Sequence, residues 1–267
     1  MSDNTTEFTK DNIDLYFKEL SKEYKKLGGR NTSVEIVLIG GAAIIESYGF
    51  RNMTTDIDAI IPAMGIMKDA INHVGDRFGL PNGWLNADFM KTSSYSPKLS
   101  AFSKPYRTFN QVLNVRYVTG EYLIAMKLKS GRQYKNDLSD IIGILAEHEK
   151  HNEPITFEKI TEAITNLYGG WNEIDEKAVS FIKAVLDNGS FEKMYAAIRE
   201  NEQNTKSVLL AFEEKYPGVL DEGNIDSVIE NAGKKSESRA SVRETLEMLK
   251  KQQTTKKEKT EKERDGR

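Results

Sequence analysis

The chain has 267 residues, of which 38% are hydrophobic and 30% charged, with a formal net charge of −3 and no cysteine. The lack of cysteine excludes disulfides, thiolate metal sites and thiol nucleophiles, and three histidines are too few for a histidine-rich metal site. No apolar run is long enough to cross a bilayer, and the polar opening MSDNTTEFTK does not resemble a signal peptide, so we expect a cytoplasmic protein with no membrane partner.

Charge is distributed unevenly along the chain. Residues 233–267 hold 12 Lys or Arg against 7 Asp or Glu, whereas the rest of the chain holds 26 against 34. The basic end is rich in Lys, Glu and Thr, a composition typical of a solvated, disordered tail. The same asymmetry is also compatible with a nucleic-acid or acidic partner.

In the first half of the chain, predicted helices and strands alternate. The patterns predict a helix at about 9–28, a strand at 34–41, a short helix at 42–50, a strand at 55–62, a helix at 65–79, a short strand or loop at 84–90 and a strand at 111–118. The polar stretch at 91–107 is predicted to be a loop.

The second half is predicted to contain helices only. They are expected at 121–132, 136–151, 155–169, 173–189 and 191–216, with a weaker one at 221–233. Strands and helices followed by helices alone indicate an α+β (α/β) fold: a small mixed-sheet domain at 1–150, a helical domain at 151–232 and a disordered basic tail at 233–267.

Two acidic residues stand in the second predicted strand, in the run TDIDAIIP. Side chains alternate along a strand, so Asp56 and Asp58 project the same way while Ile57 points into the core. Two carboxylates held this close repel each other and need a compensating cation. Mg²⁺ is the expected ion, because it prefers oxygen ligands and accepts phosphates as the others.

Two glycines follow the first predicted strand and precede the short helix. Without side chains, Gly40 and Gly41 let a phosphate chain approach the backbone, where the helix offers unpaired N–H groups and the positive end of its dipole. If the two strands are neighbours, the glycines hold a triphosphate and the aspartates hold its metal ion. Either element alone is common, since a glycine pair usually makes only a tight turn.

The ordered combination resembles the signature of the nucleotidyltransferase fold of the DNA polymerase beta superfamily. The chain looks most like the small bacterial branch related to the AbiEii abortive-infection toxins and the mycobacterial tRNA-modifying toxins. A second stretch, EYLIAMKLKSGRQYKNDLSDIIGIL, resembles a further motif of that branch, whose active-site lysine and aspartate correspond to Lys127 and Asp137. The resemblance covers roughly residues 34–145.

The resemblance implies roles for the second motif. Lys127 would place its charge on the phosphates, and Asp137 would assist a metal ion, a substrate hydroxyl or Lys127 itself. Alternatively, Lys127 is a solvated helix residue and Asp137 only stabilises the start of the next helix. Asp140 is the competing choice for the acid.

The chain departs from the family pattern at two places. The family often has serine where this chain has Gly41, so a hydroxyl contact to phosphate is lost. Many members carry a third carboxylate on a later strand, but QVLNVRYV has none, which leaves Asp88, Asp137 or Asp140 for that role. Arg51 and Thr55 flank the acidic strand and are further candidates for contacts to the nucleotide, or ordinary surface groups.

Together these features predict a Mg²⁺-dependent enzyme that moves a nucleoside monophosphate from a nucleoside triphosphate to an acceptor hydroxyl. The resemblance implies tRNA as the acceptor, growth inhibition as the outcome and a cognate antitoxin as a protein partner, in a toxin–antitoxin or phage-defence system. Two alternatives stay open. One is the same chemistry on a protein or small molecule, and the other is a domain that binds a nucleotide or a partner without turnover.

Overall fold

A computed structural model of the chain describes residues 6–61, 65–131, 136–221, 224–225 and 227–229. The predicted disordered tail at 233–267 lies outside the described residues.

The contacts divide the chain into two compact units. Unit 1 comprises Met1–Lys129 and Glu147–Glu173, and unit 2 comprises Ser130–Ala146 and Ile174–Arg267. The domain limits at residues 150 and 232 stay a prediction from the sequence. In the described parts of the chain, no helix is both long enough and apolar enough to cross a membrane.

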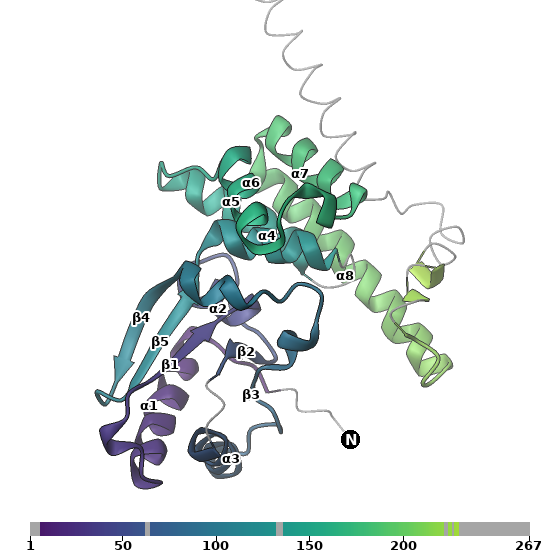
Figure 1. The fold of residues 1–267 in the computed structure, drawn as a ribbon. Coiled ribbons are helices and arrows are strands. Elements are labelled where there is room, and N and C mark those ends of the chain that lie inside the picture. Colours follow the sequence, from purple (N-terminus) through teal and green to yellow (C-terminus); the bar gives the residue numbers. More distant parts are fainter. Residues whose placement is uncertain (1–5, 62–64, 132–135, 222–223, 226, 230–267) are drawn as a thin grey trace, which may run out of the picture. The chain divides into compact units, whose positions relative to one another are not determined.

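Unit 1 is built on a five-stranded mixed sheet of order β3-β2-β1-β5-β4 (Figure 1). Its strands are β1 (Val34–Leu38), β2 (Ile57–Ile60), β3 (Leu85–Asn86), β4 (Ser103–Phe109) and β5 (Leu113–Val118). The central strand β1 runs antiparallel to β2 and parallel to β5. The predicted mixed sheet is therefore confirmed, and its two central strands carry the motifs singled out in the sequence.

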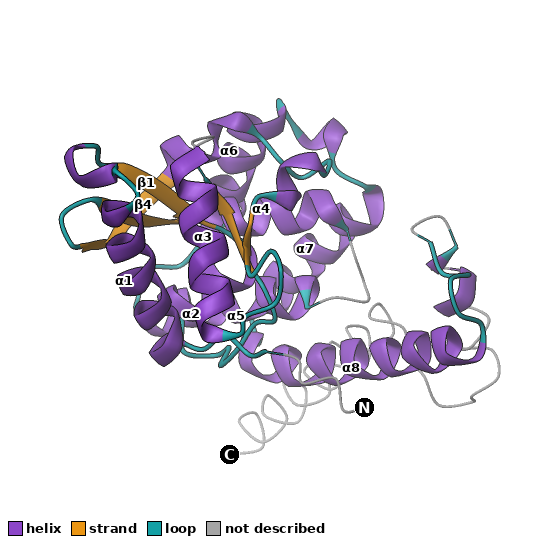
Figure 2. Cartoon of the chain, turned by 90° about the horizontal axis from the view of Figure 1, so that it is seen from below, coloured by secondary structure: helices purple, strands orange, loops and turns teal. Residues whose placement is uncertain are grey.

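Helices and short 3-10 turns surround this sheet (Figure 2). The helices are α1 (Lys10–Lys26), α2 (Gly40–Ser47), α3 (Gly65–Phe78), α4 (Gly120–Ser130) and α6 (Phe157–Tyr168). The 3-10 turns are η1 (Gly29–Asn31), η2 (Asp88–Lys91), η3 (Pro97–Phe102) and η4 (Trp171–Glu173). Helices α1 and α3 lie side by side, and α2 packs on β2 and β5.

Apolar side chains from far apart in the sequence form the core of unit 1. Phe8, Phe17, Ile36 and Ile57 are fully buried, and Trp84 is 2% exposed. Trp84 stacks on Phe8 with ring centroids 6.2 Å apart and donates a hydrogen bond from its indole N–H to the carbonyl oxygen of Ile71. The buried indole therefore has a partner for its polar group, as a core tryptophan requires.

Strand β4 corrects the prediction of a loop at 91–107. Its sequence contains Pro105, which cannot donate a ladder hydrogen bond and argues against a central strand. The structure places β4 at the edge of the sheet, where it pairs only with β5, and the register shifts between Pro105 and Arg107. An edge position and an irregular register are the two conditions under which a strand accepts proline.

Unit 2 contains helices and no strand among its described residues. They are α5 (Asp137–Lys150, whose last turn belongs to unit 1), α7 (Glu176–Asn188) and α8 (Phe191–Lys215). The predicted helical region that follows the sheet is confirmed. Asp175 begins α7 by accepting a hydrogen bond from the N–H of Lys177, and Gly189 ends it in the left-handed conformation.

Candidate functional site

The two motif strands are direct neighbours. Leu38 at the end of β1 is paired with Ala59 of β2, and the N–H of Ile39 donates to the carbonyl oxygen of Asp58 at 3.0 Å. The condition set by the sequence is therefore met: the glycines that follow β1 lie beside Asp58 of β2 in unit 1.

Gly40 stands directly against one of the two carboxylates. Its φ is +54°, a left-handed conformation that favours glycine. A Cβ added to Gly40 would lie 3.5 Å from Oδ2 of Asp58, which is ordinary contact distance. The carboxylate of Asp58 thus faces the turn that opens α2.

Gly41 lies close to the polar side chains of Thr54 and Arg51. A Cβ added here would come within 2.6 Å of Oγ1 of Thr54 and within 2.9 Å of Nη2 of Arg51. No real side chain fits at those distances unless its neighbours move. A serine at this position would therefore need Thr54 or Arg51 to move, because the hydroxyl of Thr54 occupies the space that a side chain at 41 would need.

Helix α2 begins without a side-chain cap. Its N-cap residue is Ile39, which has no group to accept a hydrogen bond from the first N–H groups of the helix. These N–H groups and the positive end of the helix dipole can bind an anion. The guanidinium of Arg51, fixed by a hydrogen bond from Nε to the carbonyl oxygen of Met53 at 3.1 Å, adds positive charge at the same point.

The acidic side of the site is formed by Asp56 and Asp58. Ile57 between them is fully buried and Asp58 is half-buried, as alternation along β2 predicts, whereas Asp56 is exposed and lies just before the strand begins. Oγ1 of Thr54 lies 3.4 Å from Oδ1 of Asp56 and can donate a hydrogen bond to it. Thr54 therefore links the glycine turn to Asp56, whereas the predicted Thr55 is exposed.

An amide, not a third acid, lies next to Asp58 on the neighbouring strand. In the parallel pairing of β2 and β3, Asn86 is the register partner of Asp58. Asp88 follows in η2, is exposed, and pairs with Lys91 at 2.8 Å. Within the residues that the structure describes, no group of three or more His, Cys, Asp or Glu side chains could hold a metal ion.

Lys127 lies in α4 and is 9% exposed. Helix α4 follows β5, whose Tyr117 is paired with Leu38 at the end of β1. Helix α4 therefore begins at the same end of the strands as the glycine turn, the turn formed by Gly40 and Gly41. A long cationic side chain buried to this extent is not a solvated surface lysine, which was the alternative interpretation.

Asp137 and Asp140 belong to unit 2. Both are in the first turn of α5, with 4% and 3% exposure, and Asp137 accepts a hydrogen bond from the hydroxyl of Ser130 at 2.5 Å. The start of α5 is also bound by Glu202 of α8, whose Oε1 accepts from the N–H groups of Leu138 and Ser139 at 2.9 and 3.1 Å. Burial raises the pKa of the Glu202 carboxyl to about 8, and the charge of Asp140 acts in the same direction.

A comparison with protein families agrees with this arrangement. The family model described as "Nucleotidyltransferase of unknown function (DUF6036)" matches residues 16–169, which include the sheet, the glycine turn, Asp56, Asp58 and Lys127. The chain belongs to this nucleotidyltransferase family. Comparisons with curated proteins and with solved structures gave no match.

The residues of the candidate site that fit a metal-bound triphosphate all belong to unit 1. Two carboxylates offer oxygen ligands for a divalent cation. The lack of a side chain at Gly41 leaves a space, here called the cradle, that a single Cβ atom would fill. The uncapped N-terminus of α2 and Arg51 supply the positive charge that phosphates need. The donor set therefore fits Mg²⁺ with a nucleoside triphosphate.

Proposed function

We propose that the chain transfers a nucleoside monophosphate from a nucleoside triphosphate to an acceptor hydroxyl with release of pyrophosphate. The observation that carries the proposal is that Oδ2 of Asp58 lies 3.5 Å from the position of a Gly40 Cβ, because this supports a phosphate site at α2 next to a carboxylate that can bind a metal ion.

The positively and negatively charged groups of the site have different proposed roles. The N–H groups at the start of α2 and the guanidinium of Arg51 bind the phosphates, and the carboxylates of Asp56 and Asp58 hold the cation. A cation held by these carboxylates would supply activation of the acceptor hydroxyl and neutralisation of charge on the leaving pyrophosphate. Thr54 fixes Asp56 and shields the turn, and Lys127 is proposed to add a positive charge for the phosphates.

A guanidinium at the positive end of a helix is unfavourable unless negative charge lies close by. The two aspartates can supply that charge, and a triphosphate bound at α2 would need a divalent cation to offset its own charge. Carboxylates beside a helix N-terminus and a guanidinium therefore support a metal-bound nucleotide as the ligand.

The proposed acceptor is RNA, with tRNA first, in a toxin–antitoxin or phage-defence system with a cognate antitoxin. The resemblance to the AbiEii-like branch in the glycine and Asp-x-Asp motifs supports this finer proposal. Asp137 is proposed as the further acid of the reaction, with the alternative that it only stabilises the start of α5.

The test incubates the full chain with labelled nucleoside triphosphates, Mg²⁺ and total tRNA. We expect label on RNA, and a loss of at least about a thousandfold in rate for Asp58→Ala, because a metal ligand is removed. The matched control is Asp69→Ala, which removes an exposed carboxylate of α3 and should leave the rate unchanged. Label on protein would show that the acceptor is a protein and not RNA. Unchanged transfer by Asp58→Ala would overturn the proposal.

One observation favours a second candidate, nucleotide binding without turnover. The register partner of Asp58 is Asn86, and the described residues contain no cluster of three acids that could share a metal ion. In that case calorimetry would detect binding of Mg²⁺ and nucleoside triphosphate that Asp58→Ala weakens, while no label reaches any acceptor.

A further inference from the structure

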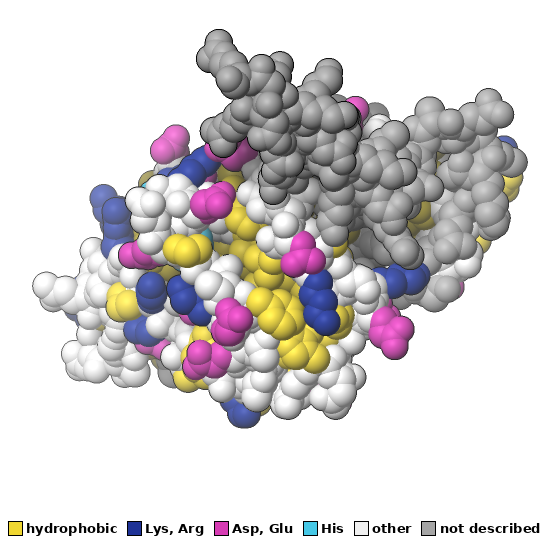
Figure 3. All heavy atoms as spheres, turned by 90° about the horizontal axis from the view of Figure 1, so that it is seen from above, with side chains coloured by type: hydrophobic (Ala, Val, Ile, Leu, Met, Phe, Trp, Pro, Cys, Tyr) yellow, Lys and Arg dark blue, Asp and Glu magenta, His cyan; other side chains and the backbone are white. Residues whose placement is uncertain are grey.

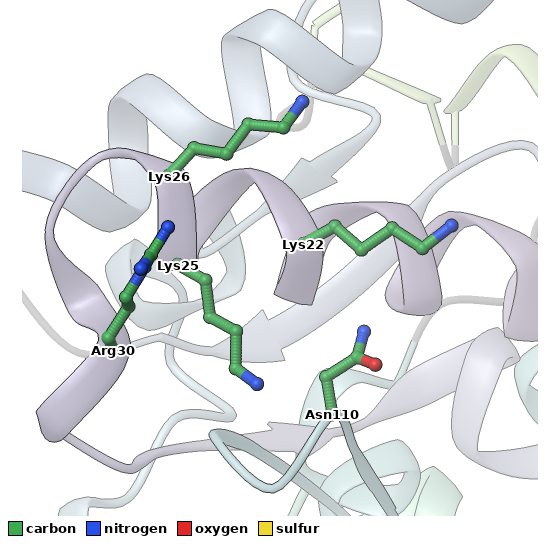
Figure 4. Close-up of a pocket in the computed structure, with 5 residues that line it drawn as sticks. All are labelled: Lys22, Lys25, Lys26, Arg30 and Asn110. Carbon is green, nitrogen blue, oxygen red and sulfur yellow. The ribbon is translucent and has the colours of Figure 1, made fainter.

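A basic hollow lies in unit 1 at the end of the sheet opposite the glycine turn. It is lined by Lys22, Lys25 and Lys26 of α1, Arg30 of η1 and Asn110 from the turn between β4 and β5 (Figure 4). Its volume is about 390 Å³. These residues, from three segments of the chain, include four cations and no acid, so the hollow is suited to a negatively charged ligand.

Two of the cations are available to a ligand. Among the described residues, the side chains of Lys25 and Arg30 form neither an ion pair nor a hydrogen bond. Lys22 pairs with Glu19 at 2.5 Å and Lys26 with Glu23 at 3.1 Å. Lys25 points toward Asn110 in Figure 4.

Glu23 lies between Lys22 and Lys25 in the sequence, but its carboxylate offsets little of the positive charge of the hollow. It is buried against α3, where Nη2 of Arg77 lies 2.5 Å and Nδ1 of His73 3.3 Å from its carboxylate. The Arg77 guanidinium, followed by Lys26 and His73, lowers the pKa of Glu23 to about 2. The carboxylate of Glu23 is therefore bound by Arg77 and His73 of α3 as well as by Lys26. No acidic side chain among the described residues forms an ion pair with Lys25 or Arg30.

The hollow is rigidly built. Nδ2 of Asn110 donates to Oγ of Ser21 at 2.6 Å, which fastens the β4–β5 turn to α1. Asn110 and Gln111 have φ values of 46° and 62°, typical of the tight turns that join antiparallel strands. By contrast, the face shown in Figure 3 intersperses acidic and basic side chains with apolar ones, so it offers no comparable concentration of one sign.

We propose that this basic hollow binds the sugar-phosphate backbone of a nucleic-acid acceptor. The inference rests on the proposed nucleotidyl transfer and adds to it where the acceptor is held. A chain whose body is acidic outside residues 233–267 repels nucleic acid in general, so binding requires a local cluster of cations. Lys and Arg on phosphates give affinity without reading sequence.

The position of the hollow sets a minimum length for the acceptor. Turn η1 with Arg30 precedes β1, and Gly40 follows it, so the two sites lie at opposite ends of this five-residue strand (Figure 1). At about 3.3 Å per residue, the strand separates them by about 16 Å. An acceptor at about 3.4 Å per nucleotide must therefore be at least about five nucleotides long to contact both.

The test uses the full chain carrying Asp58→Ala, so that binding is measured without turnover. The probe is a fluorescent single-stranded RNA of about twenty nucleotides, and its affinity is measured by anisotropy over a range of salt concentrations. We expect Lys25→Gln with Arg30→Gln to weaken binding about tenfold and to reduce the slope of log affinity against log salt by about 1.4, because two phosphate contacts are lost.

The matched control is Lys104→Gln with Lys159→Gln, which removes the same charge from exposed positions on β4 and α6. It should change the affinity less than about twofold. Equal losses in both double variants would show an effect of bulk charge and overturn the proposal.

Two further outcomes test the ligand of the hollow separately from the reaction at the glycine turn. If the hollow variant binds RNA normally but no longer binds poly-glutamate, the hollow takes an acidic polypeptide and the RNA proposal is wrong. If it loses RNA binding while the chain with Asp58 intact transfers no nucleotide, the hollow stands and the proposed transfer fails. If nucleotide is transferred to RNA and the transfer is unaffected by Lys25→Gln with Arg30→Gln, the proposed transfer stands and the hollow is not the RNA-binding site.

Discussion

Helix α2 begins after Ile39, which offers no side-chain cap, whereas helix α5 begins with two N–H groups already bound by Glu202. Both helix ends carry the same backbone donors and the same dipole. At α5 the chain satisfies them with its own buried carboxylate. At α2 it places carboxylates beside the donors and glycines in front of them.

The difference shows that a helix N-terminus does not by itself mark an anion site. Glu202 Oε1 lies directly on the donors of α5, which leaves no room for a phosphate there. At α2, Oδ2 of Asp58 lies 3.5 Å from the position of a Gly40 Cβ, so its charge lies next to the start of the helix. The second arrangement is the one that suits a phosphate together with its metal ion.

Among the variants that test this comparison of the two helix ends, the largest effect is expected from a side chain placed at Gly41 of α2. Gly41→Ser places a Cβ 2.6 Å from Oγ1 of Thr54 and must push Thr54 or Arg51 away. We expect affinity for Mg²⁺ with nucleoside triphosphate and the transfer rate to fall about a hundredfold, because a shift of about 1 Å at a reacting centre has costs of that size. Calorimetry and labelled transfer measure both.

A second variant shows whether the clash is the cause. Gly41→Ser combined with Thr54→Ala removes the atom that the new Cβ would meet first. This double variant should recover at least about tenfold of the lost affinity, since the serine then occupies the space of the threonine hydroxyl. If Gly41→Ser alone binds nucleotide normally, α2 is no more a phosphate site than α5.

The next effect concerns stability at α5. The folded-state pKa of Glu202, about 8, is above the ordinary value of 4.5, so its contribution to stability is complete below pH 4.5 and is lost as the pH rises through 8. Glu202→Gln keeps an acceptor for the N–H groups and cannot ionise. Relative to this variant, the wild-type chain should lose about 4 kcal/mol of unfolding free energy between pH 5 and 9.

Urea denaturation at pH 5, 7 and 9 measures this difference, with Glu200→Gln as the control on an exposed position of α8. The control should follow the wild-type chain at every pH. A wild-type curve parallel to that of Glu202→Gln would mean that Glu202 is ionised throughout and that the N–H groups outweigh its burial.

The parts of the α2 region that the sequence predicts obey local rules. Strand alternation predicts one direction for Asp56 and Asp58, although β2 begins only at Ile57, and a glycine pair after a buried strand predicts the turn. The structure confirms the mixed sheet and brings Gly40 next to Asp58. Their roles in binding and catalysis stay predictions.

The parts that the sequence does not predict depend on distant pairing. Thr54 and Thr55 are equivalent in the sequence, and only the bridge between Thr54 and Phe8 turns Thr54 inward. Asn86 becomes important through its register with Asp58, which two residues of strand are too short to predict. The basic hollow joins Arg30 to Asn110 across eighty positions, while the α1 lysines alone look like a solvated helix face.

The smallest expected effect also tests how the start of α5 is built. Ser130→Ala removes the hydroxyl that donates to Oδ2 of the buried Asp137, and should lower the unfolding free energy by about 1 kcal/mol. Ser207→Ala is the control, because its hydroxyl bonds only to the carbonyl oxygen of Gln203 on an exposed part of α8. If Ser130→Ala slows nucleotide transfer far more than it destabilises the fold, Asp137 acts in the reaction and α5, like α2, contributes to the catalytic site. If only stability changes, the comparison between the two helix ends holds, because a carboxylate enclosed by its own unit serves the helix that it begins.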